Sequence, residues 1–160
     1  MRAVVIVASQ RAANGIYSDT SGPIIVDGLR DLGFATPDPV VVGDGEPVAD
    51  ALRTAIADRT DVVITSGGTG LTPTDRTPEV TAPLLDRTVP GLAEAIRANG
   101  AAHTDMAWLS RGLAGTAGRT LVVNLAGSTG AAKDGLAVLT PLLRHAVEQL
   151  NGGDHERESP

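Results

Sequence analysis

Residues 61–79, DVVITSGGTGLTPTDRTPE, restrict the possible folds of this chain more than any other stretch. The stretch begins with the apolar, β-branched run 61–65, which is typical of a strand buried on both faces of a sheet. The glycine-rich residues 66–70 follow, and they allow a positive φ or a close approach to a ligand. Thr77-Pro78-Glu79 then matches a helix start, with a hydroxyl cap, a proline at the first helical position and an acid in the first turn. We therefore expect a buried strand, a bare loop and a helix, an arrangement in which open α/β sheets bind ligands.

Apolar runs elsewhere in the chain alternate with amphipathic segments. This alternation predicts a three-layer α/β/α fold with a mostly parallel sheet. A hairpin is expected where residues 112–117 and 119–125 meet at Ala117-Gly118, and residues 103–111 fit no single state. The expected strands are 3–8, 39–42, 61–65 and 120–125, the expected loop is 9–20, and the expected helices are 21–32, 48–59, 77–86, 92–99 and 131–150.

Length and composition predict a single domain. At 160 residues with 42% hydrophobic residues, the chain can bury a substantial core. Aromatic residues make up only 2% of the chain, so this core must consist of Val, Leu, Ile and Ala. We assign residues 1–150 to the domain and expect residues 151–160 to form a flexible polar tail.

Several classes of protein are disfavoured by the composition. The absence of cysteine excludes a disulfide scaffold and thiolate chemistry. A net charge of −6 and the lack of a basic cluster argue against nucleic acid as a partner. No apolar run reaches membrane-spanning length, and a first strand that begins at Arg2 leaves no room for a signal peptide. We therefore expect a cytoplasmic protein, and the charge remains compatible with a small anionic ligand held by local groups.

Three glycine-containing loops follow expected strands, at residues 43–47, 66–76 and 126–130. If these strands are parallel, the loops open on one edge of the sheet and bring together Asp44, Asp75, Arg76, Ser128 and Lys133. Two carboxylates suit Mg²⁺, which usually takes one or two carboxylates plus substrate phosphates. The bare glycine backbone offers N–H groups to anionic oxygens. This combination indicates phosphoryl or nucleotidyl transfer, in which positioning and charge neutralisation provide most of the catalysis.

Each of these features also has an ordinary structural explanation. The glycines can form a tight turn, although a turn needs only one or two of them. Asp44 can be a turn residue, and Asp75 can pair with Arg76 or cap the next helix. Lys133 can be a solvated side chain, and Ser110-Arg111 can be a polar edge.

Familiar nucleotide and metal motifs are absent from the sequence. No lysine follows Gly70 as a Walker loop requires, and the first strand leads into Ser9-Gln10-Arg11 rather than G-x-G-x-x-G. There is no G-x-S-x-G elbow either. His103, His145 and His155 lack the spacing of metal ligands, so we expect them to be surface residues.

A set of short motifs occurs along residues 3–150 in the order of one known family. The central motif is TSGGTG at 65–70, followed by Asp75 and Thr77-Pro78-Glu79. The other blocks are Gly15-Ile16-Tyr17-Ser18-Asp19 before Ser21-Gly22-Pro23, Val89-Pro90-Gly91 before Arg97, Leu109-Ser110-Arg111, and Asn124-Leu125-Ala126-Gly127-Ser128. With these blocks the chain resembles the molybdenum cofactor biosynthesis proteins of the MogA/MoaB type. These proteins are molybdopterin adenylyltransferases, related to the G domains of gephyrin and plant Cnx proteins.

The resemblance implies a homotrimer that binds molybdopterin and Mg·ATP, and that works with other molybdenum cofactor biosynthesis proteins. Such enzymes transfer AMP to the terminal phosphate of molybdopterin and release pyrophosphate. The family's two essential aspartates fall on Asp44 and Asp75, which we expect to be catalytic and to hold Mg²⁺. The resemblance assigns Thr65, Gly67, Gly68, Thr69, Gly70, Pro90 and Gly91 to the nucleotide, and Ser110, Arg111, Asn124, Gly127, Ser128 and Lys133 to molybdopterin. A bulky residue at Gly68 is then expected to block ATP alone.

The sequence departs from the family pattern at a few positions. Gln10 stands where many members have Asp or a small polar residue, Ala126 replaces the usual Pro of N-x-P-G, and Thr129-Gly130 replaces a turn that contains proline. The last two changes remove residues that would stiffen the pterin-side loop. Three other functions stay open beside the adenylyltransferase: a non-catalytic molybdopterin-binding paralogue, a nucleotide pyrophosphatase of the competence-damage type, and a purely structural trimer.

Overall fold

The computed structural model describes residues 1–16 and 18–153 of the chain. Tyr17, part of one motif block, and residues 154–160 of the expected tail lie outside the described residues. The described residues form a six-stranded sheet in the order β2-β1-β3-β6-β5-β4. The strands are β1 (Ala3–Ala8), β2 (Val40–Val42), β3 (Val62–Ser66), β4 (Arg87–Thr88), β5 (Ala114–Ala117) and β6 (Thr120–Leu125).

The four strands β2, β1, β3 and β6 are parallel, whereas β5 pairs antiparallel with β6 and with β4. Their register places Val7 of β1 beside Ser66 of β3, and Ser66 beside Leu125 of β6. The carboxyl ends of these strands therefore lie side by side, and the loops that leave them open on one edge of the sheet. This confirms the predicted mostly parallel sheet and the hairpin of β5 and β6.

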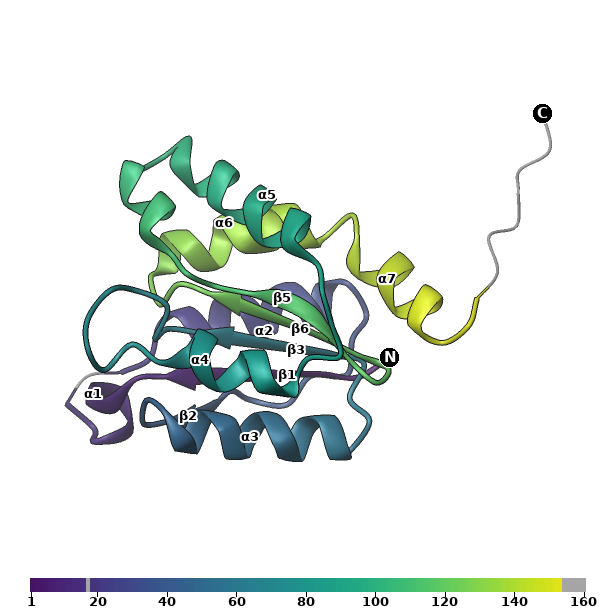
Figure 1. Ribbon diagram of the computed structural model, residues 1–160, viewed down its shortest axis with the longest axis horizontal. Helices are drawn as coiled ribbons and strands as arrows, with labels where there is room; N and C mark the ends of the chain where they lie inside the picture. The colour runs from purple at the N-terminus through teal and green to yellow at the C-terminus, as the bar shows by residue number, and fades with distance from the viewer. Residues whose placement is uncertain (17, 154–160) are drawn as a thin grey trace.

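Helices cover both faces of the sheet, as Figure 1 shows for α5 and α6 on one side and α3 on the other. One half of the core includes Ile25 and Leu139, and the other half includes Val48 and Leu52. The only phenylalanine, Phe34, is buried, and the rest of the buried core is aliphatic as expected. The helices are α1 (Gln10–Ala13), α2 (Ser21–Asp31), α3 (Glu46–Ala57), α4 (Thr77–Thr81), α5 (Pro90–Ala101), α6 (Thr129–Leu139) and α7 (Leu143–Leu150), with the 3₁₀ turns η1 (Ala82–Leu84) and η2 (Asp105–Leu109).

Two of the helix predictions were wrong because they ran through a proline. Residues 131–150 form two helices, α6 and α7, separated around Pro141. Residues 77–86 form α4 followed by η1, which contains Pro83. Proline lacks the amide hydrogen that a continuous helix needs, and its ring crowds the preceding turn.

Two further elements were not predicted at all. Helix α1 lies inside the expected loop 9–20, and the Ser9 hydroxyl caps it by accepting a hydrogen bond from the backbone N–H of Ala12 at 3.2 Å. Strand β4 is only two residues long and pairs with β5 at the edge of the sheet. Neither element is long enough to show a hydrophobic period in the sequence.

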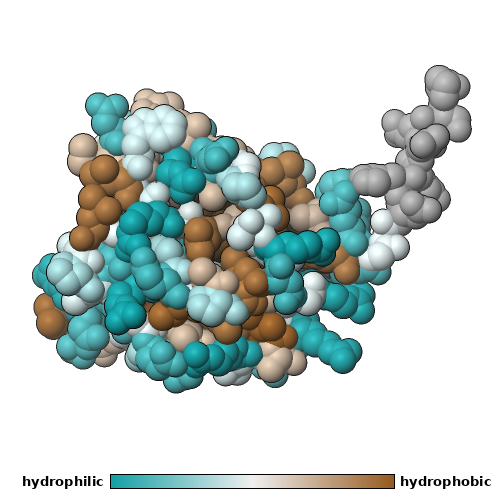
Figure 2. Space-filling view, in the orientation of Figure 1, coloured by the Kyte–Doolittle hydropathy of each residue, from teal (hydrophilic) through white to brown (hydrophobic). Residues whose placement is uncertain are grey.

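The surface carries hydrophobic residues in separate patches between hydrophilic ones on the face seen in Figure 2. Among the described residues, the exposed large apolar side chains include Met106, Trp108 and Leu109 of η2. None of the described helices combines the length and the apolar character needed to cross a bilayer.

Candidate functional site

A cavity of about 650 Å³ lies at the carboxyl ends of β1, β3 and β6. The loops after β2, β3 and β6 line one end of it, and α5, η2 and the start of α6 line the other. The site therefore lies where the parallel sheet predicts, beyond the carboxyl ends of the strands.

Asp44 lies in the loop after β2 and lines this cavity. Its Oδ2 accepts a hydrogen bond from the backbone N–H of Gln10, the first residue of α1, at 3.2 Å. This bond joins the loops after β1 and β2, so the carboxylate is held at the cavity wall.

The glycine loop after β3 is shaped by its protein neighbours. Gly67 and Gly68 have φ of +103° and +65°, which side-chain-bearing residues rarely adopt. A Cβ on Gly67 would lie 2.3 Å from the carbonyl oxygen of Ala8. A Cβ on Gly68 would lie 2.3 Å from Thr77 Oγ1 and 3.0 Å from Asp44 Oδ1. The glycines therefore let the loop pack closely against β1, Asp44 and the start of α4.

Asp75 lies five residues after Gly70 and also lines the cavity. Its Oδ2 accepts hydrogen bonds from the hydroxyl of Thr72 at 2.6 Å and from the backbone N–H of Thr72 at 3.0 Å. Neither structural alternative from the sequence is present, because Asp75 makes no described ion pair with Arg76 and does not cap α4. A Cβ on Gly70 would lie 2.8 Å from Asp75 Oδ2, so Asp75 stands beside one end of the glycine loop and Asp44 beside the other.

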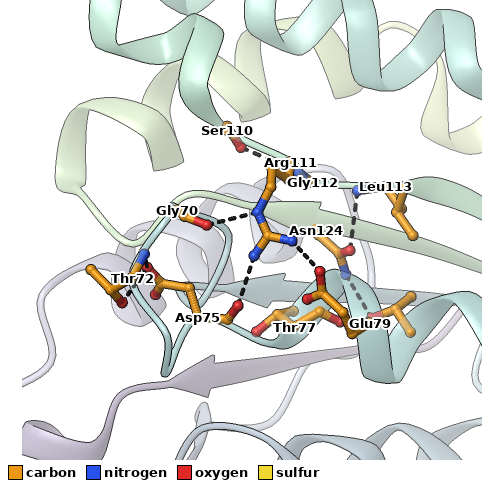
Figure 3. Close-up of polar contacts among 11 residues, drawn as sticks. Gly70, Thr72, Asp75, Thr77, Glu79, Ser110, Arg111, Gly112, Leu113 and Asn124 are labelled. Atoms are coloured by element: carbon orange, nitrogen blue, oxygen red, sulfur yellow. Dashed lines mark hydrogen bonds and ion pairs between the residues drawn. The ribbon is translucent and has the colours of Figure 1, made fainter.

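Arg111 points toward the loop 70–75 and is not among the residues that line the cavity (Figure 3). Its Nε donates to the carbonyl of Gly70 at 2.8 Å, and its Nη2 donates to the carbonyl of Asp75 at 2.7 Å. Its Nη1 forms an ion pair with Glu79. The hydrogen bond from Arg111 lowers the pKa of Glu79 below its ordinary value of 4.5.

Asn124 borders the cavity, but its amide is used inside the protein. Its Nδ2 donates to the hydroxyls of Thr65 at 2.9 Å and Thr81 at 3.1 Å, and its Oδ1 accepts from the N–H of Leu113 at 3.1 Å. Asn124 therefore ties together β3, α4, β6 and the segment before β5.

The residues expected to form the site fall into two groups. The cavity is lined by Asp44, Gly67, Gly68, Thr69, Gly70, Asp75, Ser110, Asn124, Gly127 and Ser128. Outside it lie Thr65, Pro90, Gly91, Arg111 and Lys133. Thr65 is fully buried, Lys133 is exposed on α6, and Gly91 lines a second groove between β4, α5 and α7.

The far end of the cavity contains residues that the sequence did not single out as a group. Arg97 of α5 donates from Nη1 to the carbonyls of Ser110 at 3.3 Å and Gly112 at 3.0 Å. His103, expected to be an isolated surface residue, is exposed but pairs through Nδ1 with Asp134 Oδ1 at 3.1 Å. No local pattern could reveal this pair, because the two residues lie far apart in the sequence and meet only when α5 packs on α6.

The carboxylates of Asp44 and Asp75 have the chemistry that suits a hard cation arriving with a phosphate ligand. Among the described residues, no group of three or more His, Cys, Asp or Glu could hold a metal ion. Asp44 and Asp75 lie beside the two ends of the glycine loop. Mg²⁺ that binds with a nucleotide usually takes one or two carboxylates, and phosphate oxygens and waters complete its shell. Asp44 and Asp75 are the residues that would hold such an ion.

Comparison with known proteins identifies the family. A family model described as a probable molybdopterin binding domain matches residues 4–145. The chain belongs to this family. The finding confirms the resemblance to proteins of the MogA/MoaB type, and the solved relatives confirm the fold.

Individual relatives of this molybdopterin-binding domain are similar over most of the chain. A molybdenum cofactor biosynthesis bifunctional protein from Synechococcus elongatus is 41% identical over 96% of this chain and 48% of its own length. A molybdopterin adenylyltransferase from Pyrococcus furiosus is 37% identical over 90% of both chains. The structure of the molybdopterin biosynthesis Mog protein from Mycobacterium ulcerans is 50% identical, with a TM-score of 0.90 over 93% of this chain and 98% of that one. The chain thus spans about half the length of the bifunctional relative, and most of the other two.

Proposed function

We propose that this chain is a molybdopterin adenylyltransferase of molybdenum cofactor biosynthesis. In the reaction, an oxygen of the terminal phosphate of molybdopterin attacks the α-phosphorus of ATP. A new P–O bond forms while the bond from the α-phosphorus to the bridging oxygen breaks, and pyrophosphate leaves. The observation that supports this function best is the placement of Asp44 and Asp75 beside Gly68 and Gly70, where both carboxylates line a cavity of about 650 Å³.

The chain's own residues suit this chemistry in distinct ways. Asp44 and Asp75 are held in place by Gln10 and Thr72, so little reorganisation is needed when charge develops in the transition state. A divalent cation bound with ATP would neutralise part of the negative charge on the phosphates. The glycine loop brings backbone close to the nucleotide, while Ser110 and the start of α6 lie toward the pterin.

The direct test incubates the purified protein with molybdopterin and Mg·ATP and measures adenylated molybdopterin and pyrophosphate. Asp44→Asn and Asp75→Asn should each lower turnover by at least ~10², on the order of one strong electrostatic contact in a transition state. Asp50→Asn is the matched control, because Asp50 lies on α3, contacts Arg53 and does not line the cavity. Melting temperatures should stay close to wild type in all three variants, since none removes a buried group.

The outcomes separate the competing functions. Unchanged turnover in both cavity variants would exclude a catalytic role for the two carboxylates. Tight molybdopterin binding without any adenylated product would favour a non-catalytic paralogue. Release of pyrophosphate from ATP or another nucleotide without molybdopterin would favour a nucleotide pyrophosphatase.

A further inference from the structure

The segment 110–113 lies alongside the glycine loop and is bonded to it through backbone and side chains. The backbone N–H of Arg111 donates to the carbonyl of Thr69 at 2.9 Å. The hydroxyl of Ser110 donates to the hydroxyl of Thr69 at 3.1 Å. Ser110 and Arg111 therefore lie beside Thr69, directly before the loop 70–75.

The side chain of Arg111 continues this contact to the far end of the loop (Figure 3). Its three side-chain nitrogens bond Gly70, Asp75 and Glu79, as described above, each on a different part of the stretch 70–79. The hydrogen bonds that Thr72 makes to Asp75 connect the loop only to itself. Arg111 instead joins both ends of the loop 70–75 to the neighbouring segment that contains Ser110 and Arg111.

We propose that Arg111 is a positioning residue, which fixes the Asp75 carboxylate by holding the carbonyls of Gly70 and Asp75 with one planar guanidinium. This proposal deepens the adenylyltransferase function and rests on it for the role of Asp75. It replaces the expectation that Arg111 binds molybdopterin directly. Misplacement of a catalytic group by about 1 Å can lower the rate ~10²-fold. Loss of the bonds by which Arg111 holds the backbone of Asp75 should therefore have a large effect on turnover.

Lysine at position 111 distinguishes positioning from direct binding. Arg111→Lys keeps the positive charge but loses the flat fork that reaches two carbonyls at once. If Arg111 instead bound the phosphate of molybdopterin, lysine would partly replace it, and the variant would raise the KM for molybdopterin. A positioning residue would lose kcat, with the KM values for ATP and molybdopterin nearly unchanged.

The experiment compares Arg111→Lys and Arg111→Gln with Glu79→Gln in the full chain. We expect both Arg111 variants to lower kcat at least ~10-fold, with each KM within about threefold of wild type. Glu79→Gln removes only the ion pair and leaves the bonds to Gly70 and Asp75, so its kcat should stay near wild type. In an Asp75→Asn background, Arg111→Lys should add no further loss, because both changes act through the same carboxylate.

Amide hydrogen exchange provides a readout that needs no turnover. The N–H of Asp75, bonded to the carbonyl of Thr72 at 3.0 Å, should exchange at least ~10-fold faster in both Arg111 variants than in wild type or Glu79→Gln. Unchanged exchange, or losses that multiply with Asp75→Asn, would overturn the proposal, as would a rise in the KM for molybdopterin with kcat intact. The wild-type protein could make no adenylated product while the amide of Asp75 still exchanges faster in the Arg111 variants. That result would reject the adenylyltransferase function and support the role of Arg111 in positioning the loop 70–75.

Discussion

The α-carbon of Gly68 faces the hydroxyl of Thr77 and the carboxylate of Asp44, so any side chain there meets the protein before it meets a ligand. Gly68→Ala should therefore lower stability by at least ~1 kcal/mol, from the positive φ alone, and should displace Asp44. A thermal melt measures the effect. Gly91→Ala is the matched control, because a Cβ there meets nothing within 4 Å. Equal melting temperatures for Gly68→Ala and wild type would contradict this reading.

Because of these contacts, a bulky substitution at Gly68 cannot test ATP binding separately from the fold of the loop. The sequence suggested that valine there would block ATP and leave molybdopterin binding alone. Because the added atoms would press on Thr77 and Asp44, the substitution would disturb both carboxylate placement and loop shape. Variants that keep the local packing are needed to separate the two substrates.

The ion pair of Arg111 and Glu79 should give a pH-dependent part of the stability. The folded-state pKa of Glu79 is lowered, so the unfolded chain binds its proton more readily, and the pair stabilises the fold above pH 4.5. This contribution is lost as the pH falls from 4.5 through the lower folded-state pKa. Since the Glu79 side chain is 45% exposed, the pair should contribute at most about 1 kcal/mol. The difference in melting temperature between wild type and Glu79→Gln should be present at pH 7 and shrink steadily as the pH falls below 4.5. A difference that does not shrink with falling pH would exclude this origin.

At the scale of elements, Ser128 combines two functions at the start of α6. Its Oγ accepts from the N–H of Ala131 at 3.0 Å, which makes it the helix cap, and it also lines the cavity. Aspartate and asparagine cap helices about as well as serine does. Ser128→Asp and Ser128→Asn should therefore leave the melting temperature similar and differ from each other by one negative charge.

This pair of variants tests whether the phosphate of molybdopterin approaches α6. A like charge about 4 Å from the phosphate costs several kcal/mol near a protein surface, so Ser128→Asp should weaken molybdopterin binding at least ~10-fold relative to Ser128→Asn. Separate titrations with molybdopterin and with ATP measure the two affinities. Equal losses for both ligands would show that the cavity is not divided between them as proposed.

Helices and strands could be predicted from the sequence where nearby residues alone determine them. The runs at 3–8 and 120–125 became β1 and β6 with the same bounds, because β-branched residues buried on both faces leave a clear signal. The break near Pro141 was also readable, and the prediction of one helix over 131–150 ignored it. By contrast, β4 is fixed by hydrogen bonds to β5, which no local pattern encodes.

The candidate site was predictable in the same uneven way. The position of Asp44 and Asp75 at the cavity could be predicted because each lies in a loop that follows a parallel strand, whereas their catalytic role stays a prediction. The directions of Arg111 and Asn124 depend on bonds to residues 30 to 60 positions away, such as Glu79 and Thr65. Such contacts form only after the elements have packed. Residue type and spacing alone could therefore not show that the side chains of Arg111 and Asn124 bond to other parts of the protein.

At the scale of the whole molecule, the chain should assemble as a homotrimer, an expectation that follows from the family resemblance. Each chain has a formal charge of −6, so three copies repel one another, and apolar contact has to outweigh that repulsion. Exposed apolar side chains such as Trp108 and Leu142 provide surface for such contact.

Light scattering should then report three times the chain mass of 16.3 kDa at micromolar concentrations. Salt provides the accompanying control, because the Debye length falls from about 10 Å at 0.1 M to about 3 Å at 1 M. An assembly held by apolar contact against like charges should persist or tighten as salt rises, whereas one held by ion pairs should dissociate. A monomer mass across the micromolar range would refute the trimer, and dissociation by salt would refute the apolar origin of its stability.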